Sequence, residues 1–273
     1  MYIRQINCKF AKLKNKMKTA LITGASNGIG LALAKVHASK GDNLVLVARN
    51  KSKLDEIKLE FEKNYKILVY VIGLDLSIKN AAQLVYDETT RNNIQIDYLI
   101  NNAGFGDYGM FCETNWDKES QMIDLNITAL TNFTKLYLKD MIKRKQGKIM
   151  NVASTAAFQS GPLMAVYFAT KAYVLSFSEA VDSEVRAFGI SVTALCPGAT
   201  ESGFKENAAM GESKLFKSKR IPSSQHVAEF GYKAMMKGKT VAIHGLMNLI
   251  MVHAIRFTPR ALVVKITRSL LNK

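Results

Sequence analysis

The alternation of short β-rich runs with longer helical segments is the feature that most constrains the fold of this chain. Apolar and β-branched runs recur six times, at Ala20–Thr23, Asn43–Ala48, Ile67–Ile72, Tyr98–Asn101, Lys148–Val152 and Ser191–Cys196. Segments with helical spacing separate them, among them Lys51–Lys63, Lys79–Asn92, Trp116–Arg144 and Leu163–Phe188. Because buried runs that alternate with helices form parallel sheets, the pattern predicts an α/β fold. We expect one doubly wound parallel sheet with helices on both faces.

The length of 273 residues suits a single large core. Residues 17–243 are expected to form the main domain, and the polar stretch 199–235 interrupts its rhythm as a lid insert would. Residues 1–16 have no place in the alternation, so we expect a basic, disordered N-terminal extension, and Met17 is an alternative start. Residues 244–273 form a basic, amphipathic C-terminal segment.

The net charge of +16 is concentrated at the two ends of the chain. Residues 1–18 hold six Lys and Arg and no acid, and residues 214–273 hold twelve with the single acid Glu229, whereas residues 19–213 are nearly balanced. Neither a nucleic-acid-binding motif nor basic residues interleaved with stacking aromatics are present, so we expect no nucleic-acid partner. A basic tail with apolar neighbours better suits an anionic membrane surface or an acidic substrate group.

Membrane-spanning, secreted and metal-binding classes are disfavoured by the same sequence. Val241–Ile255 comes closest to a spanning segment, but it is too short and is interrupted by histidine, glycine and asparagine. The basic start leads into a strand rather than a secretory signal. Cys8, Cys112 and Cys196 are far apart and lack metal-ligand spacing, so we expect a cytoplasmic protein without disulfides or a metal.

A glycine-rich turn lies between the first strand and the helix that follows it. Its sequence, Thr23-Gly-Ala-Ser-Asn-Gly-Ile-Gly30, has the spacing Gly-x-x-x-Gly-x-Gly. Glycines let the backbone turn tightly and approach a pyrophosphate, whose charge then meets the N-terminus of the helix. A dinucleotide is therefore expected to bind at Gly24, Ser26, Asn27, Gly28, Ile29 and Gly30.

Arg49 follows the second strand, where an acidic residue would hydrogen-bond the ribose of NAD. A guanidinium at that position can pair with a 2′-phosphate instead. The residue therefore favours NADP(H) over NAD(H), which is the alternative cofactor. The competing interpretation is a solvated arginine at the start of the next helix.

The pair Tyr167 and Lys171 carries the catalytic signal. Residues four apart share one face of a helix, so the phenol and the ammonium are expected to point into one cleft. A tyrosine with its ordinary pKa near ~10 exchanges protons poorly at neutral pH. We expect the nearby cation, with an oxidised nicotinamide, to lower that pKa.

These motifs occur in the order of the classical short-chain dehydrogenase/reductase (SDR) family, which residues 18–205 resemble. The shared residues are the glycine turn, Asn101-Asn102-Ala103-Gly104, Asn126, Ser154, Tyr167-x-x-x-Lys171 and Pro197-Gly198. The resemblance implies a Rossmann fold in which Ser154 hydrogen-bonds the substrate oxygen and Asn126 holds a water of the proton path. It implies further cofactor contacts at Asp75, Leu76, Asn102, Ala103, Gly104, Pro197, Gly198, Thr200 and Ser202, beside Tyr167 and Lys171.

By this resemblance the chain is an oxidoreductase that moves a hydride between NADP(H) and a small carbonyl or alcohol substrate. An apolar aldehyde or ketone is expected, in a pocket formed by Phe105, Tyr108, Phe111, Phe158, Leu163 and Met164. The alternatives are an NAD-dependent alcohol or hydroxysteroid-type dehydrogenase and a non-catalytic dinucleotide sensor. The resemblance also implies a homodimer or homotetramer that associates through the two long helices.

The C-terminal segment from Arg260 reads as a basic amphipathic helix. Leu262, Val263, Ile266 and Leu270 fall on one face, whereas Lys265, Arg268 and Asn272 fall on another. One hypothesis is peripheral contact with an anionic membrane. The other is a helix buried against a second subunit or across the cleft of its own domain.

Overall fold

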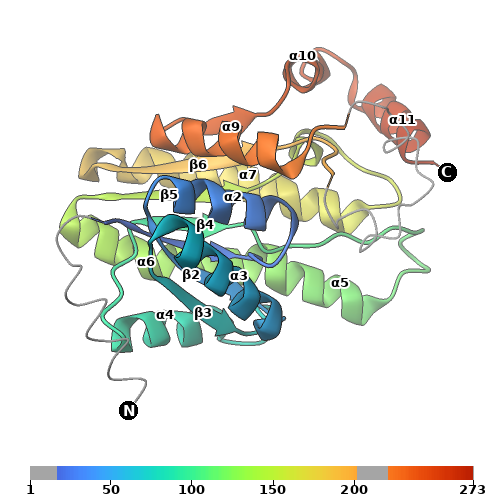
Figure 1. The fold of residues 1–273 in the computed structure, drawn as a ribbon. Coiled ribbons are helices and arrows are strands. Elements are labelled where there is room, and N and C mark those ends of the chain that lie inside the picture. The colour runs from blue at the N-terminus through green and yellow to red at the C-terminus, as the bar shows by residue number, and fades with distance from the viewer. Residues whose placement is uncertain (1–16, 202–220, 273) are drawn as a thin grey trace.

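A parallel sheet forms the centre of the molecule (Figure 1). The structure is a computed structural model that describes residues 17–201 and 221–272. In this part of the chain the sheet has seven strands in the order β3-β2-β1-β4-β5-β6-β7, and every neighbouring pair is parallel. The strands are β1 (Thr19–Thr23), β2 (Asn43–Ala48), β3 (Val69–Gly73), β4 (Tyr98–Asn101), β5 (Gly147–Val152), β6 (Ile190–Cys196) and β7 (Val241–Ile243). The predicted doubly wound α/β fold is confirmed.

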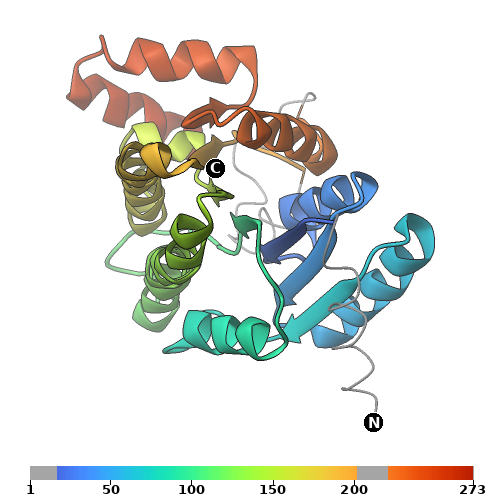
Figure 2. The ribbon, with the colours of Figure 1, turned by 90° about the vertical axis from the view of Figure 1, so that its left-hand side faces the viewer.

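Helices cover both faces of the sheet, as the view along the strands shows (Figure 2). One layer is built from α2 (Gly28–Ser39), α3 (Lys51–Tyr65) and α9 (Ser224–Met236). The other is built from α4 (Ala81–Arg91), α5 (Trp116–Ile123), α6 (Leu130–Arg144) and α7 (Ala165–Val185). The helices change from one layer to the other after β3, so the strand order reverses between the neighbouring strands β1 and β4. At such a reversal a crevice opens beyond the carboxyl ends of the strands.

The central strands are buried on both faces, which explains their apolar sequences. Every residue of β1, β2, β4 and β6 is buried, and Leu21 pairs in register with Val45 on one side and Leu99 on the other. The six predicted strands are all present within two residues of their expected ends. The sequence analysis missed β7, because its three residues lie within the continuous apolar stretch Val241–Ile255 and lack a period of their own.

The two long helical segments are interrupted where the sequence predicted continuous helices. A π-helical turn (Asp124–Ala129) separates α5 from α6, and the chain otherwise stays helical through Trp116–Arg144. The second segment begins two residues late, because Leu163 has a left-handed φ of 68° that a helix cannot contain. It ends in a 3₁₀ turn, Arg186–Phe188.

The predicted lid insert 199–235 is wrong for its C-terminal part. From Ser224 onward the chain is the framework helix α9, whose Val227, Ala228, Ala234 and Met235 are buried. Their helical spacing places α9 on the sheet beside α2, where it belongs to the core rather than to a lid. Residues 202–220, which include Ser202, and the predicted extension 1–16 lie outside the described residues.

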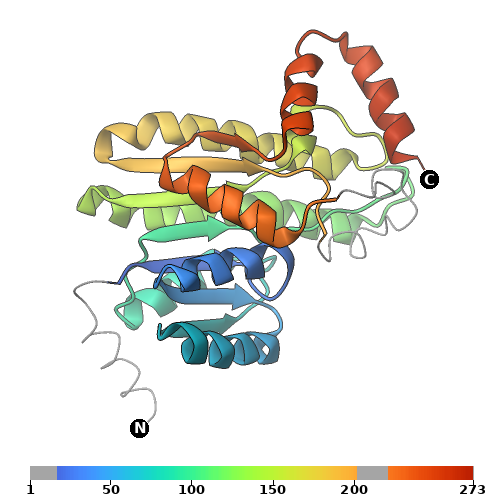
Figure 3. The same ribbon diagram turned by 45° about the horizontal axis from the view of Figure 1, so that its top comes forward.

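The C-terminal residues form a pair of helices, α10 (Leu246–Ile255) and α11 (Arg260–Leu271), at the carboxyl side of the sheet (Figure 3). The amphipathic helix predicted from Arg260 is therefore present. Of the apolar face named there, Val263 is buried, together with Thr267 and Leu271, whereas Leu262 and Ile266 are about half exposed. In the described ranges, no helix has the length and the apolar character needed to cross a membrane.

Candidate active site

A cleft of about 1450 Å³ opens at the carboxyl ends of the strands, where the strand order reverses. Its wall is formed by the glycine turn, the ends of β2, β4, β5 and β6, the start of α7, and helices α10 and α11. Within residues 17–201 and 221–272, no three His, Cys, Asp or Glu side chains are grouped as a metal site requires.

The glycine turn is shaped by close backbone contacts. Gly24 has a φ of +66°, and a Cβ there would lie 2.9 Å from Cα of Ala103. A Cβ on Gly30 would lie 2.2 Å from the carbonyl oxygen of Gly24, so a larger residue would push α2 away from the turn. In the described chain Asn27 makes no side-chain cap on α2, and the first turn of α2 holds no acid. The first N–H groups of α2 therefore suit an anion.

The turn after β4 is bound directly to the glycine turn. Asn102 donates its Nδ2 to the carbonyl oxygens of Thr23 at 2.9 Å and Gly24 at 3.2 Å. The backbone N–H groups of Asn102 and Ala103 both donate to Thr23 Oγ1 at 3.0 Å. The two turns hence form one rigid floor, and Gly104 continues it toward Lys171.

Arg49 stands at the rim of the cleft, directly after β2. Its guanidinium lies 4.0 Å from Oδ2 of Asp75, and its side chain is largely exposed. The other carboxylate oxygen of Asp75 accepts two hydrogen bonds from Ser77, at 2.9 and 2.8 Å, which hold the turn after β3. An exposed ion pair of this length contributes little to stability, so Arg49 is available to a ligand.

Tyr167, Lys171 and Ser154 meet at the other end of the cleft. Tyr167 and Lys171 lie one helical turn apart on α7, both are buried, and the Lys171 Nζ is 5.8 Å from the centre of the Tyr167 ring. Lys171 donates a hydrogen bond of 2.8 Å to the carbonyl oxygen of Val152 at the end of β5. Ser154 follows β5, and its hydroxyl accepts a hydrogen bond from Ala156 N–H and interacts with the Tyr167 phenol.

Burial, rather than the nearby cation, dominates the proton affinities here. Desolvation raises the pKa of Tyr167 to about 12, and the hydrogen bond with Ser154 lowers it in part. Desolvation also lowers the pKa of Lys171 to about 8. Lys171 is not among the groups that shift the Tyr167 pKa, and the lowering expected with an oxidised nicotinamide beside it stays a prediction. At neutral pH Tyr167 is a phenol, the form that donates a proton.

Asn126 lies behind the cleft wall, in the π-helical turn. Its Nδ2 donates to the carbonyl oxygen of Phe105 at 3.0 Å and to Thr170 Oγ1 at 3.1 Å, while its Oδ1 accepts from Phe105 N–H at 3.2 Å. A Cβ on Gly104 would come within 2.8 Å of that Oδ1. The side chain of Asn126 thus positions the loop that follows the floor of the cleft.

The cleft gathers nearly all of the predicted site residues that the structure describes. Gly30 and Asn126 do not line it, since they support the wall from behind, and Ser202 lies outside the described residues. The sequence analysis missed several polar cleft residues: Gln159, His226, His244 and Asn248. Asn248 abuts Gly198, where a Cβ would lie 2.6 Å from its Nδ2. No motif marked these positions, and His226 and Asn248 reach the cleft only through the tertiary packing of α9 and α10.

The apolar wall of the cleft also differs from the prediction. Of the six residues predicted to form it, Phe105 and Met164 line the cleft, whereas Tyr108, Phe111, Phe158 and Leu163 lie elsewhere. The C-terminal helices supply the wall instead, through Leu246, Met247, Met251, Val252, Ile255, Val263, Ile266, Leu270 and Leu271. The prediction placed the pocket on the loops nearest the motifs, but α10 and α11 fold back over them.

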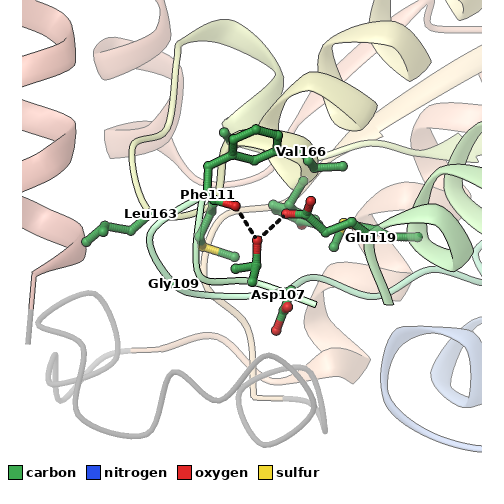
Figure 4. A pocket seen from close by; sticks show the side chains of 11 residues that line it. Asp107, Gly109, Phe111, Glu119, Leu163 and Val166 are labelled. Atoms are coloured by element: carbon green, nitrogen blue, oxygen red, sulfur yellow. Dashed lines mark hydrogen bonds between the residues drawn. The ribbon is translucent and has the colours of Figure 1, made fainter. Parts of the chain in front are cut away.

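A second, very small pocket lies between the loop after β4 and the start of α7 (Figure 4). Its lining includes Asp107, Gly109 and Phe111 of the loop and Leu163 and Val166 around the start of α7. The Thr114 hydroxyl lies within hydrogen-bond distance of the Phe111 carbonyl oxygen and the Glu119 carboxylate, at 3.0 and 2.9 Å. Its volume of about 10 Å³ admits no more than a water molecule, so the substrate space belongs to the large cleft.

A family model described as short chain dehydrogenase matches residues 18–213. The chain belongs to the short-chain dehydrogenase/reductase family, and it is an oxidoreductase with the nucleotide-binding Rossmann fold of that family. The comparison thus agrees with the resemblance that the motifs indicated.

Two curated relatives and one solved structure illustrate the similarity. An uncharacterized oxidoreductase of Staphylococcus epidermidis is 31% identical over 208 residues, which cover 76% of this chain and 89% of that protein. The very-long-chain 3-oxoacyl-CoA reductase of Homo sapiens is 31% identical over 184 residues, which cover 65% of this chain but 58% of that longer protein. A short-chain dehydrogenase from Sphingobium yanoikuyae, solved in complex with NADPH, is 29% identical with a TM-score of 0.79, and the match covers 88% and 94% of the two chains.

Proposed function

We propose that this protein is an NADPH-dependent reductase of apolar aldehydes or ketones. The observation that carries the proposal is the buried phenol of Tyr167, which is protonated at neutral pH and lies in one cleft with Ser154 and a wall of apolar side chains. Reduction of a carbonyl requires a proton donor at this position, and Arg49 at the far rim suits a 2′-phosphate. The two remaining candidates are the NAD-dependent alcohol or hydroxysteroid-type dehydrogenase and the non-catalytic sensor.

The residues present fit the dinucleotide. The uncapped start of α2 and the glycine turn would hold the pyrophosphate, Arg49 the 2′-phosphate, and Lys171 the ribose. Asp75 and Leu76 lie where the adenine would contact the wall, and Pro197, Gly198 and Thr200 border the opposite end of the cleft. The bound cofactor would supply a hydride to the carbonyl carbon.

The side chains of this protein then complete the reduction to an alcohol. Tyr167 gives its phenolic proton to the carbonyl oxygen, and Ser154 donates a hydrogen bond to the same oxygen as negative charge develops on it. Asn126 holds the Phe105 loop against the floor of the cleft. Lys171, whose ammonium is held by a hydrogen bond to the Val152 carbonyl, orients the cofactor. The apolar wall from α10 and α11 selects a substrate with a hydrocarbon body. The long-chain acyl substrate in the name of the human relative is consistent with such a cleft.

The test is NADPH consumption with a series of aldehydes and ketones of increasing chain length, with Tyr167→Phe in parallel. Loss of the proton donor is expected to lower kcat by about 100-fold or more, while NADPH still binds with wild-type affinity. Tyr173→Phe is the matched control, since Tyr173 lies on the same helix but outside the cleft, where its hydroxyl pairs with Thr131. Equal turnover of wild type and Tyr167→Phe contradicts the assignment. NADPH binding without turnover of any carbonyl favours the sensor.

A further inference from the structure

The C-terminal helices and the turn between them expose apolar side chains that do not line the cleft. We define this outer face by Leu249, Ile250, Phe257 and Leu262, which are exposed to 38, 54, 89 and 47% and do not line the cleft. Helix α10 is apolar almost throughout, yet against the described part of the chain it buries one residue, Val252. A helix that is apolar on all sides is normally buried by other parts of the protein or by a partner, so we expect the exposed surface of α10 to bind a partner.

The same two helices carry exposed cations and no acid. Arg256, Arg260, Lys265 and Arg268 are exposed and, like the outer face, do not line the cleft. The sequence contains no Asp or Glu after Glu229, so nothing on these helices neutralises the four charges. Apolar side chains beside uncompensated cations match an interface between hydrocarbon and negative headgroups.

We propose that the outer face of α10 and α11 docks on an anionic phospholipid surface. Leu249, Ile250, Phe257 and Leu262 would enter the boundary between headgroups and acyl chains, while the four cations would contact the headgroup phosphates. The helices lie on the bilayer and do not cross it, in keeping with their length of 10 and 12 residues. The view in Figure 3 shows the pair standing out from the sheet, where a flat surface can reach it.

Charge argues against a second copy of the chain as the occupant. A two-fold contact through this face would set the four cations of one copy against the same four of the other, with no acid to pair them. Residues 1–16 would not bind to this face either, because they are basic as well and would repel the four cations. An anionic lipid surface is the occupant that satisfies both the apolar and the charged parts of the outer face.

Docking in this orientation would place the active-site cleft beside the bilayer. Met247, Met251 and Ile266 lie on the same two helices as the outer face, but they line the cleft. An apolar substrate dissolved in the membrane would therefore be separated from Tyr167 by this one pair of helices. The docking itself rests on the exposed residues alone and does not require the proposed catalytic activity.

The experiment is flotation of the full-length protein with vesicles of phosphatidylcholine, with and without phosphatidylglycerol. We expect recovery with the anionic vesicles and a steep decline with added salt. Replacement of Arg260, Lys265 and Arg268 by Gln should lower the partition coefficient by about 100-fold, since each Lys or Arg near an anionic surface contributes a factor of about five. Phe257→Ser with Leu262→Ser should weaken binding to a similar degree, because the contact loses its apolar part.

The matched control replaces three cations exposed elsewhere on the molecule by Gln: Lys63, Arg91 and Lys143. This variant has the same net charge as the C-terminal one and should float like the wild type. Equal recovery with neutral and anionic vesicles, or an equal loss in both charge variants, overturns the proposal. So does sedimentation that shows Phe257→Ser with Leu262→Ser dissociating a dimer while vesicle binding is unchanged, since the outer face would then be a subunit contact.

Discussion

Single residues decide the chemistry of the cleft, and Arg49 illustrates how a residue can do so without a structural role. It follows β2 at the rim, its side chain is largely exposed, and its nearest acid is the Asp75 carboxylate at 4.0 Å. Because so exposed a pair contributes little to folding, substitution of Arg49 isolates its effect on ligands. Tyr167 and Lys171 are the opposite case, since burial itself sets their protonation.

Arg49→Ala should reduce the preference for NADPH over NADH. Loss of a charge-assisted contact to the 2′-phosphate costs about 1.5–3 kcal/mol, or roughly 10- to 150-fold in kcat/KM for NADPH, with little change for NADH. Steady-state kinetics with both cofactors measure the ratio. Arg91→Ala is the control, as this arginine is exposed on α4 outside the cleft. An unchanged ratio would assign Arg49 to the solvent-exposed start of α3.

Reductive turnover should decline at alkaline pH because of Lys171. Burial lowers the pKa of Lys171 to about 8, so its ammonium is charged below that pH and progressively lost above it. Tyr167, with a pKa of about 12, stays protonated over the same range and does not contribute to the decline. A pH profile of kcat/KM for NADPH-dependent reduction tests this, and a profile that stays flat through about pH 10 would show that the lysine charge is dispensable.

At the scale of elements, buried polar contacts hold α7 in register with the strands that end at the cleft. Asp182 of α7 is buried, and its Oδ1 accepts a hydrogen bond of 2.8 Å from the backbone N–H of Val192 in β6. Its Oδ2 accepts from Arg186 Nε at 2.7 Å and from Thr240 Oγ1 at 2.8 Å, next to β7. One carboxylate therefore joins the catalytic helix to the two last strands of the sheet.

Asp182→Ala should lower the free energy of unfolding by about 3 kcal/mol, because it leaves a buried N–H group without its acceptor and Arg186 without its anion. Chemical denaturation followed by circular dichroism measures the loss. Asp55→Ala serves for comparison, since it breaks an exposed pair with Lys51 and should cost no more than about 0.5 kcal/mol. Similar losses in both variants would mean that the buried network adds nothing beyond a surface ion pair.

At the scale of the whole molecule, the two C-terminal helices close a cleft that the sheet leaves open. Helix α11 buries Val263, Thr267 and Leu271 toward the body, and Met247 and Met251 of α10 complete the wall. The end of α11 is attached to the loop after β4, because Tyr108 donates a hydrogen bond of 3.1 Å to the carbonyl oxygen of Leu271. Two segments far apart in the chain thus meet beside the cleft.

Tyr108→Phe should loosen this closure while leaving the sheet intact. One hydrogen bond of about 1 kcal/mol corresponds to a roughly fivefold increase in the opening of α11. Hydrogen–deuterium exchange of residues 260–271 measures it. Tyr86→Phe removes a comparable hydrogen bond to Asp140 between α4 and α6, and it should leave the exchange of α11 unchanged. Faster exchange of α11 in both variants would point to general destabilisation.

Local sequence patterns were sufficient to predict much of the fold and of the candidate site. The six strands of the doubly wound sheet follow from periodicity, and the grouping of Gly24, Ser154, Tyr167 and Lys171 follows from motif spacing and the family resemblance. Parallel strands place their carboxyl ends at one edge, so residues that follow different strands must meet there. The position of Arg49 at the rim could be predicted for the same reason, since this residue directly follows β2.

Local sequence patterns therefore suffice for the sheet, its helical layers and the line of residues along its carboxyl edge, because each depends on a short-range period or a close backbone approach. The apolar wall of the cleft, the face that α11 buries and the high pKa of Tyr167 depend on the folded chain. Each of these depends on segments far apart in the chain, such as α10 over Gly198 and Leu271 against Tyr108. Desolvation and packing arise when such segments come together, and no local pattern encodes them.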